Sequence, residues 1–144
     1  MIRVAALATA LALGLAACGS DASDDTSADT NTAATELTLT LDPDGSAGED
    51  AIQATVSCPG DAAAVCDAVA ALPAQPTDPV PPETACTEIF GGPDTLKIEG
   101  TLRGERVSAH LTRVNGCEID RFDRFTDLLA ALFPDYRPGA SLQP

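Results

Sequence analysis

The sequence has little of what nucleic-acid binding requires. It contains no Trp, one Tyr and four Phe, and its 22 acidic residues outnumber eight Lys and Arg, for a net charge of −14. A chain this acidic lacks the basic surface that contacts phosphate backbones or anionic membranes, and it has few aromatic rings for base stacking. We therefore predict no nucleic-acid partner, and we interpret the acidity as an aid to solubility.

The common catalytic and metal-binding motifs are also missing. The chain has no nucleophile elbow, phosphate-binding loop or HExxH motif. The only histidine, His110, lies in an alternating pattern opposite Ala109 and Leu111, which favours a surface side chain over a general base. With one His and no CxxC pair, a structural zinc site is not expected. We predict no enzyme activity, no cofactor and no metal.

The first 17 residues have the features of an export signal. Arg3 gives one positive charge, and an apolar run of Ala and Leu extends from Val4 to Leu15. This run is too short to span a bilayer, which takes roughly twenty residues, so it fits a signal peptide. The next residues, Ala16-Ala17-Cys18, complete what looks like a bacterial lipobox. We predict lipid attachment at Cys18 and anchoring to the outer face of the cell membrane; the alternative is an ordinary signal peptide and an extracellular protein.

The rest of the chain divides into three parts by composition. Residues 18–36 are mostly Ser, Asp, Ala and Thr, with no aromatic and no large aliphatic residue. Such a segment cannot bury enough apolar surface to offset its ordering entropy, so we predict a disordered acidic tether. One folded domain is expected over residues 37–134, followed by a C-terminal tail over 135–144.

Strand patterns occur in two pairs. Residues 37–41 alternate with period two, residues 52–58 alternate again, and the segment between them has turn composition. A second pair is expected over 96–98 and 107–111, around the turn that Gly100 and Gly104 bracket. Each pair predicts an antiparallel hairpin.

Helices are predicted after each hairpin. One helix follows Asp61, its expected N-cap, carries Val65, Val69 and Leu72 on one face and ends at Pro73. Five prolines over residues 73–82 then force an extended loop. The last helix carries an apolar stripe that we interpret as core or dimer contact rather than a ligand groove: Phe122, Phe125, Leu128, Leu129 and Leu132. This order predicts an α+β domain, with helices on one face of an antiparallel sheet.

The cysteine count predicts two disulfides. The chain has five cysteines. If Cys18 carries lipid, an even number remains, namely Cys58, Cys66, Cys86 and Cys117. Sequence reasoning alone leaves three pairings open.

These cysteines and their neighbours resemble the Streptomyces subtilisin inhibitor family over residues 36–118. The residues that carry the resemblance are Cys58-Pro59-Gly60, Cys66, Leu72, Cys86-Thr87-Glu88-Ile89-Phe90, Leu96 to Gly100, Gly104 to Val107, and Asn115-Gly116-Cys117-Glu118. The resemblance implies an α+β fold with about five antiparallel strands and two helices. It also implies the pairs Cys58–Cys66 and Cys86–Cys117, and a homodimer as one form of assembly.

The same resemblance implies a function and a site. The family's protease-contacting bond falls here between Glu88 and Ile89, with Cys86, Thr87, Phe90 and Gly91 as loop contacts. Asn115 would support the loop from below. The expected partner is an extracellular serine protease, either subtilisin-like or selective for acidic residues, because a Glu side chain is costly to bury in an apolar pocket. The alternative is an inhibitor fold kept as a non-inhibitory surface interaction or structural module.

Several features depart from the family pattern. The segment between Cys58 and Cys66 is shorter than in the secreted inhibitors, and the C-terminal helix is longer. Gly91-Gly92 is also expected to add backbone freedom where a rigid loop is wanted.

Overall fold

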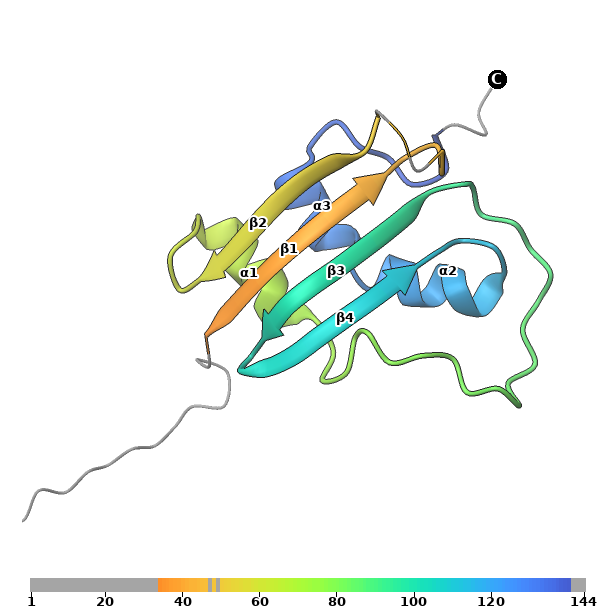
Figure 1. The fold of residues 1–144 in the computed structure, drawn as a ribbon, viewed down its shortest axis with the longest axis horizontal. Coiled ribbons are helices and arrows are strands. Elements are labelled where there is room, and N and C mark those ends of the chain that lie inside the picture. The colour runs from red at the N-terminus through yellow and green to blue at the C-terminus, as the bar shows by residue number, and fades with distance from the viewer. Residues whose placement is uncertain (1–33, 47, 49, 141–144) are drawn as a thin grey trace, which may run out of the picture.

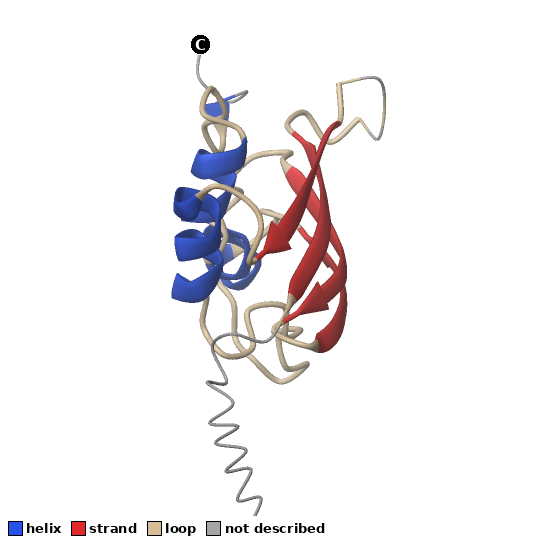
Figure 2. Cartoon of the chain, turned by 90° about the vertical axis from the view of Figure 1, so that its left-hand side faces the viewer, coloured by secondary structure: helices blue, strands red, loops and turns tan. Residues whose placement is uncertain are grey.

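The fold is an antiparallel sheet with helices packed on one face (Figures 1 and 2). The computed structural model describes residues 34–46, 48 and 50–140. Four strands pair in the order β2-β1-β3-β4, and their bounds are Thr35–Asp42 (β1), Ile52–Cys58 (β2), Thr95–Leu102 (β3) and Glu105–Leu111 (β4). The helices are α1 (Ala63–Ala71), α2 (Gly116–Asp123) and α3 (Thr126–Leu132). The expected α+β class is therefore confirmed.

The count of elements differs from the expectation. The described residues form four strands and three helices, where the resemblance implied about five strands and two helices. No strand forms in the proline-rich stretch 73–82, because proline has no N–H to donate to a sheet. The predicted last helix is divided into α2 and α3 at Arg124 and Phe125. There the amide of Phe125 donates to the carbonyl of Phe122, a short-range bond that tightens the chain between the two helices.

Alternation in the strands builds the core. Leu37, Leu39 and Leu41 of β1 are buried, while Thr38 and Thr40 between them lie on the other face. β1 pairs with β2 on one side and β3 on the other, and Leu39 lies opposite Ala54 and Ile98. Both predicted hairpins are confirmed.

The helices complete this core from one side. In α1, Val65 and Val69 are buried, and the helix ends just before Pro73, as predicted. The predicted C-terminal stripe is core: Phe122, Phe125, Leu128 and Leu129 are buried among the other apolar side chains. Leu132 is half-buried against the same core, so the interpretation of the stripe as core is confirmed.

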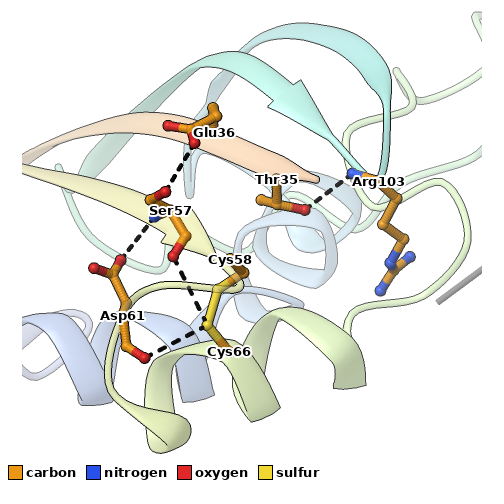
Figure 3. Close-up of a disulfide and its surroundings, with 7 residues drawn as sticks. All are labelled: Thr35, Glu36, Ser57, Cys58, Asp61, Cys66 and Arg103. Carbon is orange, nitrogen blue, oxygen red and sulfur yellow. Dashed lines mark hydrogen bonds between the residues drawn. A yellow bond between two sulfur atoms is a disulfide. The ribbon is translucent and has the colours of Figure 1, made fainter. Parts of the chain in front are cut away.

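The expected N-cap of the first helix is wrong. The N-cap residue is Ala62, and it makes no side-chain capping bond. Asp61 instead accepts a hydrogen bond from the amide of Ser57 at 2.7 Å, and the Ser57 hydroxyl donates to Glu36 at 2.8 Å (Figure 3). Asp61 therefore secures the turn that follows β2.

The other end of α1 is capped from a distant turn. Arg103, between β3 and β4, donates through Nη2 to the carbonyls of Val69 at 2.8 Å and Leu72 at 2.6 Å, and through Nη1 to Pro73 at 2.9 Å. Carbonyls in the last turn of a helix have no partner within the helix, and a positive charge there is favourable. Arg103 thereby connects the sheet to α1.

The described strands and packed side chains extend beyond residues 37–134 at both ends. β1 begins at Thr35, whose side chain is 2% exposed and accepts a hydrogen bond from the Arg103 amide at 3.0 Å (Figure 3). Residues 135–140, predicted as a tail, include Tyr136, which packs against the core and bonds to Asp94. The predicted signal peptide, the lipobox with Cys18 and nearly all of the tether lie outside the described residues. Among the described helices, none combines the length and apolar character needed to cross a bilayer.

Candidate functional site

Two disulfides link the cysteines in the pairs that the resemblance implied. Cys58 at the end of β2 is bonded to Cys66 in α1, with Cα atoms 5.7 Å apart (Figure 3). Cys86, in the long loop before β3, is bonded to Cys117 in the first turn of α2, with Cα atoms 5.4 Å apart. Two such bonds fit an oxidising compartment. Only the second disulfide joins the candidate loop, residues 86–91, to the rest of the domain.

The candidate loop is held by main-chain hydrogen bonds on both sides of the Glu88–Ile89 peptide bond, which is the bond predicted to contact a protease. The Gly116 amide donates to the Thr87 carbonyl at 2.9 Å, and the Gly91 amide donates to the Arg113 carbonyl at 2.8 Å. Residues 87–91 therefore run antiparallel to residues 113–116. Three residues lie between the two bonds on the loop side and only two on the facing side, so the loop bows outward.

The outward part of the loop consists of the residues predicted to contact a protease. Glu88 is exposed, Ile89 is 61% exposed and Phe90 is 53% exposed. Val114, in the facing segment, is 56% exposed. Single exposed apolar side chains are common, but three of the four exposed large apolar side chains among the described residues lie in these two facing segments, where contiguous exposure would favour a contact surface.

Close packing surrounds the glycines on both sides of this loop, so that a side chain at either position would displace a neighbour. A Cβ on Gly116 would overlap the Thr87 hydroxyl. A Cβ on Gly91 would lie 2.7 Å from Cδ1 of Ile119 in α2. The expectation that Gly91 adds freedom is therefore wrong: both its amide and its carbonyl are hydrogen-bonded, and its Cα packs against a helix. Gly92 is buried, with φ at +128°, a region that side chains rarely allow.

Arg113 is the main side-chain support of the loop. Its Nε donates to the Gly91 carbonyl at 3.1 Å, and its Nη1 forms an ion pair with Asp123 of α2. The guanidinium also lies 5.1 Å from the centre of the Phe122 ring, within cation–π range. The Arg113 side chain is only 10% exposed. A buried charge that is paired and hydrogen-bonded in this way fixes its partners in place.

Asn115 has a different contact from the one expected. It is the N-cap of α2, and its Oδ1 accepts a hydrogen bond from the Glu118 amide at 3.0 Å. Asn at the N-cap with Glu three residues later is a standard start to a helix. Asn115 therefore orients the helix that bears Cys117, and its support of the loop through the side chain stays a prediction.

The proline-rich segment before the loop is fastened to α2 by arginines. Arg121 donates from Nε to the Asp78 carbonyl at 2.7 Å, from Nη2 to the Thr77 carbonyl at 3.1 Å and from Nη1 to Glu118 at 2.6 Å. A cleft of about 430 Å³ lies between this segment and α2. Because every nitrogen of Arg121 is engaged, the arginine serves the architecture of the long loop rather than a ligand in the cleft.

Other candidate chemistry is dispersed. His110 is exposed on β4, as the alternating pattern predicted, and its strand partner is Lys97. Within the part of the chain that the structure describes, no three His, Cys, Asp or Glu side chains are grouped to hold a metal ion. Comparisons with protein-family models, curated proteins and solved structures found no match. The geometry of the loop is therefore the basis for a functional proposal.

Proposed function

We propose that this protein is a lipid-anchored inhibitor of an extracellular serine protease and that it acts through a substrate-like loop with Glu88–Ile89 as the reactive bond. One observation carries the proposal: Glu88, Ile89 and Phe90 protrude from a loop that is fixed on both sides by main-chain hydrogen bonds and by the Cys86–Cys117 disulfide. A loop already held in one conformation avoids much of the ordering cost of binding.

The disulfide also explains how such a loop resists hydrolysis. The protease serine attacks the Glu88 carbonyl carbon, the bond to the Ile89 nitrogen breaks, and the proton released from the serine passes to that nitrogen. The cut falls inside the ring closed by Cys86 and Cys117, so the new amine remains beside the acyl-enzyme. The Ile89 amine then attacks the acyl carbon, restores the peptide bond and returns the serine hydroxyl, in competition with water.

The side chains of the loop indicate the kind of protease. Burying the Glu88 carboxylate in an apolar pocket without a partner would cost several kcal/mol. A protease with a basic specificity pocket and an apolar surface for Ile89 and Phe90 fits best.

The register of the sheet supports surface display. β1 starts at Thr35, and its other end at Asp42 lies opposite Thr95, where the candidate loop enters β3 (Figure 1). The loop therefore lies at the opposite end of the sheet from the point where the chain enters the domain. If Cys18 is acylated, the intervening residues reach at most about 60 Å when extended, which is long enough to hold the loop clear of the membrane.

A substitution at Glu88 tests the inhibitor proposal. Glu88→Met should convert the protein into an inhibitor of subtilisin, because an unbranched apolar side chain suits an apolar pocket. Glu105→Met, at the opposite end of the sheet, is the matched control and should leave the inhibition profile unchanged. If neither the native chain nor Glu88→Met inhibits any protease, the result contradicts inhibition and favours the alternative, an inhibitor fold kept as a non-inhibitory surface interaction or structural module.

A further inference from the structure

A buried carboxylate lies directly behind the candidate loop. Asp94 is 1% exposed and stands between Gly92 and the start of β3. It accepts a hydrogen bond from the Tyr136 hydroxyl at 2.8 Å, and the Gly139 amide lies 3.2 Å from each of its oxygens. Both partners belong to residues 134–140, which we call the C-terminal strap. The Asp94 side chain thus joins the residues between the candidate loop and β3 to the C-terminal strap, which lies more than forty residues later in the sequence.

The strap also touches the loop through its backbone. A Cβ on Gly139 would lie 2.9 Å from the Gly91 carbonyl oxygen, and a Cβ on Gly92 would lie 3.1 Å from the Gly139 Cα and would overlap the Asp94 carboxylate. Gly139 has φ at +70° and Gly92 has φ at +128°. Glycine on both sides lets the two backbones meet without intervening side chains.

The Tyr136 hydroxyl remains a donor in this contact. Burial first, and then its hydrogen bond to Asp94, raises the pKa of Tyr136 well above the ordinary value for a phenol. The hydroxyl is therefore protonated across the physiological pH range.

We propose that Asp94 is a positioning residue, which uses the C-terminal strap to hold the amine side of the Glu88–Ile89 bond. This inference rests on the proposed inhibitor function. When the bond is cut, the acyl side is retained by Cys86 and by the Thr87 carbonyl, while the amine side is retained through Gly91. Arg113 holds Gly91 from one direction and the strap holds it from another. The strap thus favours religation by keeping the Ile89 amine within reach of the acyl carbon.

Two variants of the full chain test the strap. Asp94→Asn keeps the size of the side chain but directs an amide N–H toward the Gly139 N–H, whereas Tyr136→Phe removes the hydroxyl alone. Each should raise the ratio of cleaved to intact Glu88–Ile89 at equilibrium with the protease by about tenfold, equivalent to about 1.4 kcal/mol. Thr35→Val is the control, because it removes a buried hydrogen-bonding hydroxyl at the opposite end of the sheet. It should lower the melting temperature and leave the ratio unchanged.

Hydrogen exchange separates failure of the strap from failure of the proposed function. Without any protease, the Gly91 amide should exchange about tenfold faster in Asp94→Asn and Tyr136→Phe than in the native chain, while the Leu39 amide changes only with global stability. Unchanged Gly91 exchange would overturn the strap proposal. Faster Gly91 exchange in a protein that inhibits no protease would retain the strap as a clamp on the loop and reject both inhibition and the role in religation.

Discussion

Removal of each disulfide in turn should separate the stability of the fold from the function of the loop. All four cysteines of the pairs are half-buried, so Cys→Ala substitutions change similar environments. Cys86 and Cys117 are 31 residues apart, which corresponds to about 3.7 kcal/mol of stabilisation in the chain-entropy model. Cys58 and Cys66 are 8 apart, which corresponds to about 2.5 kcal/mol. The difference in unfolding free energy between the two double variants should therefore be only about 1.2 kcal/mol.

The effects on inhibition should differ far more than those on stability. The variant without Cys86–Cys117 should be cleaved at Glu88–Ile89 as an ordinary substrate and should lose at least about a hundredfold in apparent affinity, because the acyl side of the loop then keeps only the hydrogen bond at the Thr87 carbonyl. The variant without Cys58–Cys66 should inhibit as the native chain does, since that bond joins β2 to α1 and does not touch the loop.

The assay combines urea unfolding with residual protease activity and mass spectrometry of the cleaved chain. Both variants are compared at a temperature and urea concentration where each is folded. Equal loss of inhibition in the two variants would contradict this prediction, because the loop would then depend only on overall stability. Slow cleavage and full inhibition without Cys86–Cys117 would refute it equally.

Three further predictions concern single residues. Gly116→Ala should displace the Thr87 side chain, whose hydroxyl the new Cβ would overlap, destabilise the fold by about 1 kcal/mol and speed cleavage of the loop; unchanged cleavage kinetics would contradict this. Arg103→Met should cost about 1–3 kcal/mol in urea unfolding by uncapping α1, with no change in inhibition, and a loss of inhibition would show that the two ends of the sheet are coupled. As pH rises above about 10, where Tyr ionises in the unfolded chain, the native chain should lose stability because the pKa of Tyr136 is higher when folded. The slope cannot exceed about 1.4 kcal/mol per pH unit, the limit for one proton, and the total loss is reduced because the phenol is only half-buried. Tyr136→Phe should lack this loss in pH-dependent unfolding.

Local patterns predicted the elements well because the core is built from them. The alternation of Leu37, Leu39 and Leu41 is enough to define a strand with one buried face, and the prolines after Leu72 are enough to end α1. The cysteine count predicted two bonds, and the pairing came from the resemblance alone. Asp61 illustrates the limit of a local rule: it is a good N-cap residue by type, yet its carboxylate binds the amide of Ser57 behind it.

The supports of the loop could not be predicted from the sequence because each acts over a long separation. Arg113 reaches Gly91 22 residues away, and Asp94 reaches Tyr136 42 residues away. Arg113 follows β4 and Asp94 precedes β3, and neither position carries a sequence signal for its role. Their partners become neighbours only in the tertiary fold. The Gly91-Gly92 pair shows the same point in reverse. The sequence predicts a flexible segment, but Gly91 packs against Ile119 and Gly92 packs against Gly139, and these contacts leave little room for a side chain.

The most direct test is titration of residues 19–144, produced in an oxidising compartment, against subtilisin-like, trypsin-like and glutamate-selective serine proteases. Residual activity and cleavage at Glu88–Ile89 are followed together over time. The proposal predicts tight inhibition of a glutamate-selective protease with slow, incomplete cleavage of that bond. Rapid and complete cleavage, or no inhibition of any protease in the panel, would contradict it.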